Sequence, residues 1–195
     1  MQKGIKVLVF CVCLIPFFYL FIQLLLNNLG PDPGEELSKE LGEWTLRFLI
    51  ATLAISPLRQ LAGIKSINRY RRMIGLFVLF YASFHFFVYQ MFILNFRWSS
   101  LYQEVLERPY ISVGFSAYLI LLTLGITSPI YMVRKLGKNW KRLHQLVYLA
   151  AVLGIVHMVW ILRSNFGEAL LYGSIVAALL GYRIVRKIYA LKGSS

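Results

Sequence analysis

Long apolar runs separated by short polar stretches dominate the chain, and their lengths predict the fold. Each run has about 20 residues, the length that a helix needs to cross the hydrocarbon core of a bilayer. The loops between the runs are too short for a second folded domain, and no internal repeat is evident. We therefore interpret residues 1–195 as one all-α integral membrane domain, a bundle of six membrane-spanning helices. These helices are predicted over residues 7–26, 44–61, 73–94, 110–126, 143–162 and 166–182.

Composition and charge agree with this pattern and orient the bundle. Hydrophobic residues make up 58% of the chain and charged residues 15%, whereas about a quarter of a typical soluble protein is charged. The formal net charge of +13 comes from short Lys and Arg clusters between the apolar runs, a pattern of membrane topology and not of nucleic-acid binding. All 8 acidic residues and few of the 21 basic ones fall on the side opposite both termini. Both termini are therefore predicted to be cytoplasmic, with residues 27–43 and 95–109 as outer loops.

Three histidines in the apolar runs, His85, His144 and His157, are the candidate functional residues. Ionisable side chains inside membrane helices are costly and usually functional. His85 lies thirteen residues from the inner end of its helix and His157 fifteen residues from the inner end of its own, so at about 1.5 Å per residue both lie about 20 Å from the inner surface. Two neutral imidazoles at one depth on facing helices suit the axial coordination of haem iron. The alternative is a pair of core histidines hydrogen-bonded between helices.

A second haem is left open by the sequence. His144 is near the inner surface, and at its level the helix that carries His85 offers no histidine, only Arg71 and Arg72. An inner haem would be ligated by His144 alone, by His144 with an unusual partner, or with an arginine serving its propionates. The alternative role of the two arginines is positive-inside anchoring.

Two other residues near the predicted haem levels have two interpretations each. Gly154, one turn before His157, would let a flat macrocycle approach the backbone, or it would serve ordinary packing of small residues between helices. Arg47, one turn into the second predicted helix, would pair with a haem propionate or extend to the membrane surface, and we favour the second. Zinc is a weaker interpretation of the histidines, because no cysteine or nearby carboxylate completes a tetrahedral site.

Six segments spread over nearly the whole chain carry a family resemblance: LGPDPGEELSKELGEW, TLRFLIATLAISPL, NRYRRMIGLF, ERPYISVG, MVRKLGKNW and KRLHQLVYLAAVLGIVH. Together they resemble the haem-binding membrane subunit of the bacterial periplasmic methionine sulfoxide reductase system. The resemblance is closer than a general likeness to ferric reductases and NADPH oxidases, whose membrane domains share the six helices and the histidines on the third and fifth. It implies a single ferric reductase-like transmembrane haem-binding domain.

This resemblance implies a b-type cytochrome in the bacterial inner membrane, an electron-transfer subunit and not itself an enzyme. It would pass electrons to a periplasmic molybdopterin-containing methionine sulfoxide reductase, and receive them from a cytosolic flavin reductase or membrane quinol. By matching motif positions, His85, His144 and His157 take the haem-ligand roles, for one b haem or two. FMN is associated with the family, although no residue here indicates a flavin site. Arg71 or Arg72 stands where the wider oxidase pattern has a second histidine on the third helix.

Other function classes fit the sequence less well. A different ferric reductase-like electron carrier is the nearest alternative. A histidine-dependent, proton-coupled transporter would also carry carboxylates within its helices, whereas the acidic residues here are predicted in outer loops or at helix ends. A purely structural protein would not need level histidines on two helices. No glycine-rich nucleotide fingerprint or cysteine cluster is present, so NAD(P)H and iron–sulfur chemistry are not expected.

Overall fold

The computed structural model describes residues 2–162 and 166–192, and the described chain is helical without strands. The predicted outer turn at residues 163–165 lies outside this description. The helices are α1 (Gln2–Leu25), α2 (Pro33–Leu61), the 3-10 helix η1 (Lys65–Tyr70), α3 (Arg71–Val88), the π-helical turn η2 (Tyr89–Ile93), α4 (Trp98–Glu107), α5 (Pro109–Ile126), α6 (Ile130–Leu136), α7 (Lys138–Leu143), α8 (Leu146–Ile161) and α9 (Gly167–Lys192).

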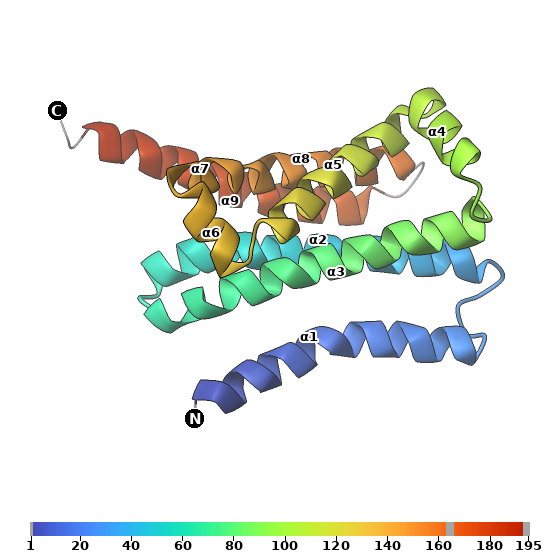
Figure 1. Ribbon diagram of the computed structural model, residues 1–195, viewed down its shortest axis with the longest axis horizontal. Helices are drawn as coiled ribbons and strands as arrows, with labels where there is room; N and C mark the ends of the chain where they lie inside the picture. The colour runs from blue at the N-terminus through green and yellow to red at the C-terminus, as the bar shows by residue number, and fades with distance from the viewer. Residues whose placement is uncertain (1, 163–165, 193–195) are drawn as a thin grey trace.

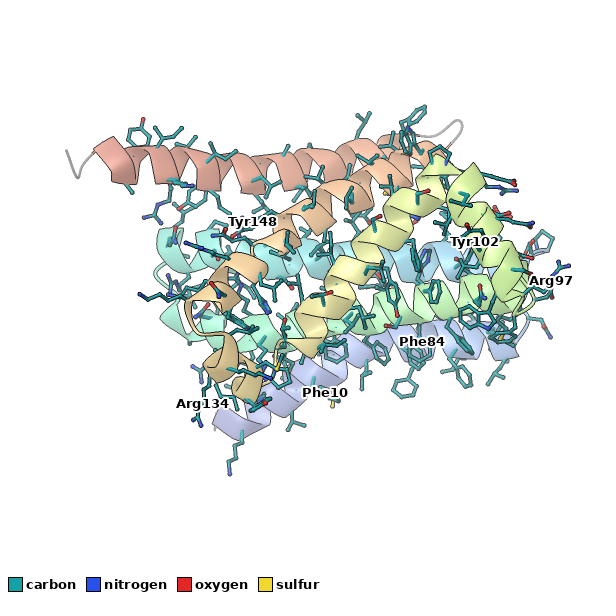
Figure 2. The ribbon with its side chains drawn as sticks, turned by 45° about the horizontal axis from the view of Figure 1, so that its top comes forward. Phe10, Phe84, Arg97, Tyr102, Arg134 and Tyr148 are labelled. Carbon is teal, nitrogen blue, oxygen red and sulfur yellow. The ribbon has the colours of Figure 1, made fainter. Side chains whose placement is uncertain are left out.

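The long helices run back and forth along one axis, so the molecule has two distinct ends (Figure 1). Both ends of the chain lie at one of them, together with η1, α6 and α7; we call this the basic end. The opposite end holds the α1–α2 connection and α4, and we call it the acidic end. Arg134 marks the basic end, while Arg97 and Tyr102 mark the acidic end (Figure 2). The start of α1 and the end of α9 thus lie at the same end of the bundle, and the cytoplasmic location of this end stays a prediction.

Five helical stretches in the described chain are long and apolar enough to cross a membrane: Lys3–Leu25, Ser66–Ile93, Pro109–Ile126, Lys138–Ile161 and Gly167–Ala190. They confirm the prediction of an all-α multi-pass membrane protein. The remaining long helix, α2, is less apolar but packs against α1, α3, α8 and α9. Among its polar residues, Ser38, Glu43 and Thr52 are buried and so are kept from lipid, where they would be costly. A count of six spans depends on α2 and stays a prediction.

Two predicted outer loops are largely helical, so the loop prediction was wrong for them. Asp32 caps α2 by accepting a hydrogen bond from the Glu35 N–H (3.0 Å), and Pro33 stands at the first helical position. A capping Asp, a first-turn Pro and acidic residues in the first turn all favour a helix start. In the second loop α4 forms because it is amphipathic: Leu101 is buried against the bundle, whereas Tyr102 is exposed.

The predicted helix over residues 143–162 is interrupted at its inner end. Before this segment, Gly137 separates the short helices α6 and α7, with φ +50°, a conformation that favours glycine. His144 lies at the C-cap of α7, and α8 begins only at Leu146. His144 and His157 therefore do not share one regular helix, contrary to the prediction.

The apolar core forms two clusters, one on each side of α2. The first joins α2 to α3, α5, α8 and α9, and its buried members are Leu46, Leu49, Leu53, Val78, Ala82, Leu121, Ala150, Ala151 and Val176. The second joins α2 and α3 to α1, and its buried members are Cys13, Leu20, Leu37, Leu41, Phe77, Tyr81 and Val88. The first cluster holds together α2, α3, α5 and α8, the helices that carry the candidate site.

Tyr81 fastens α1 to α3 through the α1 backbone. Its fully buried hydroxyl donates to the Cys13 carbonyl (2.8 Å) and accepts from the Phe17 N–H (3.0 Å). These two backbone groups would be partners in an undisturbed α-helix, but Pro16 stands between them and distorts the helix. The Tyr81 hydroxyl thus satisfies both groups and fixes the position of α1.

Candidate functional site

His85 on α3 and His157 on α8 meet inside the bundle, with their rings in contact. Their ring centroids are 6.3 Å apart and their ring planes cross at 83°. Both residues are half-buried. The structure therefore brings together the two histidines that the sequence placed at equal depth.

Both rings donate a hydrogen bond from the same nitrogen to a backbone carbonyl. His85 Nδ1 lies 2.7 Å from the Ser38 carbonyl oxygen on α2, and His157 Nδ1 lies 2.7 Å from the Tyr110 carbonyl oxygen on α5. A carbonyl oxygen only accepts, so Nδ1 carries the proton and the Nε2 lone pair is left for a metal. Metal-binding histidines commonly have this arrangement, because the second hydrogen bond fixes tautomer and ring orientation.

A glycine lies against each ring, and sequence reasoning identified neither. A Cβ at Gly42 would lie 3.2 Å from His85 Nδ1 and 3.3 Å from its Cε1. A Cβ at Gly114 would lie 2.5 Å from both Cε1 and Nδ1 of His157, far inside van der Waals contact. The backbone of α2 and α5 therefore approaches the rings more closely than a side chain would permit.

This geometry fits two axial ligands of one haem iron. A metal–imidazole bond is about 2.0 Å and the ring centre lies about 1 Å behind the nitrogen, so two imidazoles on opposite sides of one metal have centroids roughly 6 Å apart. The observed separation of 6.3 Å agrees with that value. No group of three or more His, Cys, Asp or Glu residues that would hold a bare metal ion occurs in the described chain. The histidine pair therefore stays the predicted ligand set.

His144 is held differently, at the basic end. Its Nε2 lies 3.1 Å from the buried Thr127 hydroxyl, which itself lies 2.7 Å from the Thr123 carbonyl. The Trp140 ring stacks on His144 with centroids 4.0 Å apart, and Trp140 Nε1 donates to the Thr127 carbonyl. Since the Thr127 hydroxyl donates its proton to the Thr123 carbonyl, its oxygen accepts a hydrogen bond from His144 Nε2. In the His85–His157 pair, by contrast, the Nε2 atoms have no such partner in the described chain, and Nδ1 is the hydrogen-bonded nitrogen.

The other predicted contact residues lie in different surroundings. Arg71 is near enough to His144 to act on it electrostatically, and its guanidinium donates to the Ser56 hydroxyl at 3.4 Å. Arg72 is exposed. A Cβ at Gly154 would make an ordinary contact, 3.8 Å from Leu46 on α2. This geometry favours helix packing for Gly154, and the structure gives no contact between it and the histidine pair.

The Arg47 side chain reaches back along α2 toward the acidic end, the direction expected of a side chain that extends to the outer surface, and it contacts Glu43 and Glu40 there. Its guanidinium lies 2.5 Å from the buried Glu43 carboxylate and donates to the Tyr172 hydroxyl at 2.9 Å. It also lies over the Trp44 ring, 4.6 Å from the centroid. Arg47 and Glu43 therefore compensate each other's charge inside the bundle, and Glu43 does not act as an isolated intramembrane carboxylate.

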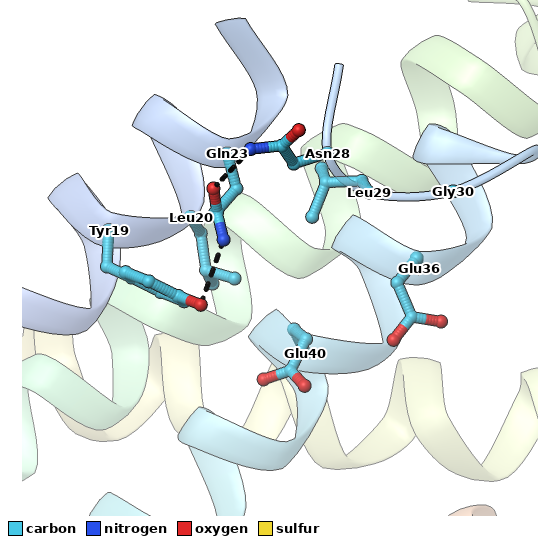
Figure 3. Close-up of a pocket in the computed structure, with 8 residues that line it drawn as sticks. All are labelled: Tyr19, Leu20, Gln23, Asn28, Leu29, Gly30, Glu36 and Glu40. Carbon is cyan, nitrogen blue, oxygen red and sulfur yellow. Dashed lines mark hydrogen bonds between the residues drawn. The ribbon is translucent and has the colours of Figure 1, made fainter. Parts of the chain in front are cut away.

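A polar cavity of about 380 Å³ opens at the acidic end, between α1 and the start of α2 (Figure 3). Gln23 donates to the Tyr19 hydroxyl and accepts from Asn28 along one wall. Glu36 and Glu40 line the opposite wall. Two carboxylates disfavour a phosphate group, so this cavity does not suit the FMN that the resemblance suggests.

Comparison with known proteins shows the family of the chain. The model of the ferric reductase-like transmembrane component matches residues 41–155. A protein of Xanthomonas euvesicatoria pv. vesicatoria (strain 85-10), named protein-methionine-sulfoxide reductase heme-binding subunit MsrQ, is 46% identical over 164 residues, 84% of this chain and 75% of its own. Its namesake in Polaromonas naphthalenivorans (strain CJ2) is 42% identical over 187 residues, 94% of this chain and 85% of its own. The chain belongs to the MsrQ branch of the ferric reductase-like transmembrane family.

Membership of the MsrQ branch confirms the resemblance seen in the sequence. The family match covers Gly42, His85, Gly114 and His144 and ends two residues before His157. No solved structure matches the chain. The geometry of the histidine pair described above therefore comes from this chain alone.

Proposed function

We propose that this MsrQ-branch protein is a b-type cytochrome that carries electrons through the bacterial inner membrane to a methionine sulfoxide reductase. The observation that supports it most is the His85–His157 pair. Each Nδ1–H donates a hydrogen bond to a main-chain carbonyl, which leaves both Nε2 atoms for iron. The relatives are named as haem-binding subunits of a protein-methionine-sulfoxide reductase. A bound haem would supply reversible one-electron chemistry to a protein that has no redox-active cysteine pair of its own in the described chain.

The residues of the chain have distinct roles in this proposal. His85 and His157 hold the iron, and the Ser38 and Tyr110 carbonyls fix their rings. His85 lies fourteen residues from the start of α3 but only eight from the end of η2, so the pair is nearer the acidic end. A haem held there suits transfer to a periplasmic partner that docks at the acidic end. We expect that partner to be a molybdopterin-containing catalytic subunit, with no catalytic residue in this chain.

The electron donor would act at the basic end, which we place in the cytoplasm with both termini. The helices α6 and α7 lie there (Figure 1) and carry four exposed basic side chains, namely Arg134, Lys135, Lys138 and Lys141. They suit an acidic or flavin-phosphate-bearing surface such as that of a cytosolic flavin reductase. Membrane quinol is the alternative donor. His144, with Arg71 close by, is the candidate ligand of a second haem at this level, and FMN remains an expectation from resemblance only.

An electron-transfer assay with a matched partner tests this function. The purified chain in lipid vesicles is reduced chemically, and the periplasmic subunit is then added with or without methionine sulfoxide. We expect a Soret band in the purified protein and reoxidation of the haem that requires both the subunit and the sulfoxide. Reoxidation by ferric chelates but not by the subunit with sulfoxide would favour the other ferric reductase-like carriers. A purified protein without a Soret band would contradict the cytochrome function and favour a transporter.

A further inference from the structure

The two halves of the histidine site share one spacing along the sequence. The hydrogen-bonded partners are 47 residues apart in both halves, from Ser38 to His85 and from Tyr110 to His157. In both halves the glycine against the ring lies four positions after the residue whose carbonyl accepts the hydrogen bond. A Ser-Pro pair also recurs in register, so that the ordered positions are Ser38, Gly42, Ser56, Pro57 and His85 in the first half, and Tyr110, Gly114, Ser128, Pro129 and His157 in the second.

The same correspondence holds in space. The first half is the hairpin of α2 and α3, and the second is the hairpin of α5 with α8; both pairs of helices pack closely. α2 and α5 both run from the acidic end to the basic end, and α3 and α8 both return (Figure 1). The two hairpins therefore have the same orientation, and each contributes one histidine to the meeting point between them.

We propose that the haem-binding site is built from a duplicated helical hairpin. Gly42 and Gly114 are its equivalent positioning residues, one for each of the two histidines that would ligate the iron. This inference rests on the haem ligation proposed above. It replaces our expectation that the chain has no internal repeat. Parallel repeats related by an axis along the membrane normal are a known way to build a site between two similar halves.

Helix geometry explains why glycine recurs four positions after the carbonyl. In α2 the carbonyl of Ser38 faces the N–H of Gly42 one turn later, and in α5 the carbonyl of Tyr110 faces Gly114 in the same way. A ring that donates to such a carbonyl lies against the next turn of the same helix. A side chain there would crowd the ring against its hydrogen-bond acceptor, so this turn favours glycine.

The two copies differ in how closely the ring approaches. A Cβ at Gly114 would approach two atoms of the His157 ring to 2.5 Å, whereas a Cβ at Gly42 would come no nearer than 3.2 Å to the His85 ring. The first overlap requires the ring to move, while the second requires a shift of a few tenths of an ångström. The copies also differ at the basic end, where the same register pairs His144 with Arg72.

Three alanine variants of the full chain test this inference, with haem content, the low-spin optical spectrum and CO binding by the reduced protein as readouts. We expect Gly114→Ala to lower low-spin haem per protein about tenfold or more and to permit CO binding, in line with losses after changes to groups that orient the ligands of a metal. Gly42→Ala should lower it about two- to threefold. Gly173→Ala is the matched control, because its Cβ would make an ordinary contact with Ile155 at 3.5 Å, and it should bind haem as the wild type does.

The outcomes separate this inference from the proposed function. Wild-type haem content and no CO binding in Gly114→Ala would overturn the positioning role while leaving haem ligation intact. Equal losses in Gly114→Ala and Gly173→Ala would also overturn it, because the effect would then be general packing. If Gly114→Ala protein cannot be recovered, Gly42→Ala decides, and a spectrum and CO response identical to wild type would overturn the proposal. A wild-type protein without haem would instead contradict the function.

Discussion

The His85–His157 pair and His144 show how one residue type is prepared for different roles in one bundle. In the pair, each Nδ1 donates to a main-chain carbonyl and a glycine makes room for the ring. At His144 the partner is the Thr127 side chain, the nitrogen engaged is Nε2, and an indole ring covers one face. The immediate hydrogen-bond partner, rather than the histidine itself, therefore decides which nitrogen a metal would meet.

The largest expected effect tests the difference between the histidine pair and His144 directly. Replacing either His85 or His157 by Ala should abolish the same low-spin haem component, because one iron needs both ligands. Replacing His144 by Ala should leave that component in place. Optical spectra of the purified variants, normalised to protein, measure all three. Loss of different components in the two pair variants would show that the histidines serve different haems.

Tyr81→Phe should lower stability without touching the pair, and so separates haem ligation from helix packing. The Tyr81 hydroxyl satisfies the Cys13 carbonyl and the Phe17 N–H, and removing it leaves two buried backbone groups unpaired at a cost of about 1–3 kcal/mol. We expect a thermal unfolding midpoint several degrees lower and an unchanged haem spectrum. Tyr172→Phe is a matched control for loss of a hydroxyl. It removes the hydroxyl that accepts a hydrogen bond from Arg47 at the opposite face of α2. A Tyr81→Phe protein as stable as the wild type would contradict the bridging role.

Thr127→Val sharpens the contrast at the basic end. It removes the hydroxyl that binds His144 Nε2 and keeps the shape of the side chain, so the loss of one hydrogen bond should cost about 1 kcal/mol. Redox titration should show an unchanged midpoint for the His85–His157 component. If the midpoint potential of the His85–His157 component shifts as much as that of any second haem component, the sites of the histidine pair and of His144 are not independent.

The smallest effect concerns the two ends of the molecule. Reduction by a soluble cytosolic flavin reductase should slow as salt rises, because exposed charges interact over about 8 Å at physiological ionic strength. Reversing Lys135 and Lys138 to Glu should slow it further, whereas reversing Arg97 at the acidic end should not. Stopped-flow reduction rates measure this. Rates indifferent to salt and to all three changes would leave topology as the role of the basic residues and favour quinol as donor.

The sequence predicted those parts of the molecule that depend on side-chain chemistry. Apolar runs and charge asymmetry indicated a multi-pass helical bundle, and the depth of His85 and His157 predicted their meeting. The start of α2 was readable from Asp32 and Pro33, but the acidic residues that follow were interpreted as a loop. The turn at His144 was missed because a continuous apolar run hides the break between α7 and α8.

The remaining features depend on the backbone, which has no sequence signature of its own. The Ser38 and Tyr110 carbonyls accept the histidine protons whatever side chains they carry. Gly42 and Gly114 are recognisable only when the chain is folded and a ring is found against each. The repeat was equally hidden, because the two hairpins share spacing at a few positions and little else.

The central claim is that His85 and His157 ligate one iron, and electron paramagnetic resonance of the oxidised wild-type protein tests it most directly. The relative orientation of two axial imidazole planes sets the splitting of the iron d orbitals, and here the planes cross at 83°. We predict a low-spin ferric signal of strong anisotropy, typical of nearly perpendicular axial rings, that disappears in both His85→Ala and His157→Ala. A high-spin signal in the wild type, or a low-spin signal that survives either substitution, would contradict the claim.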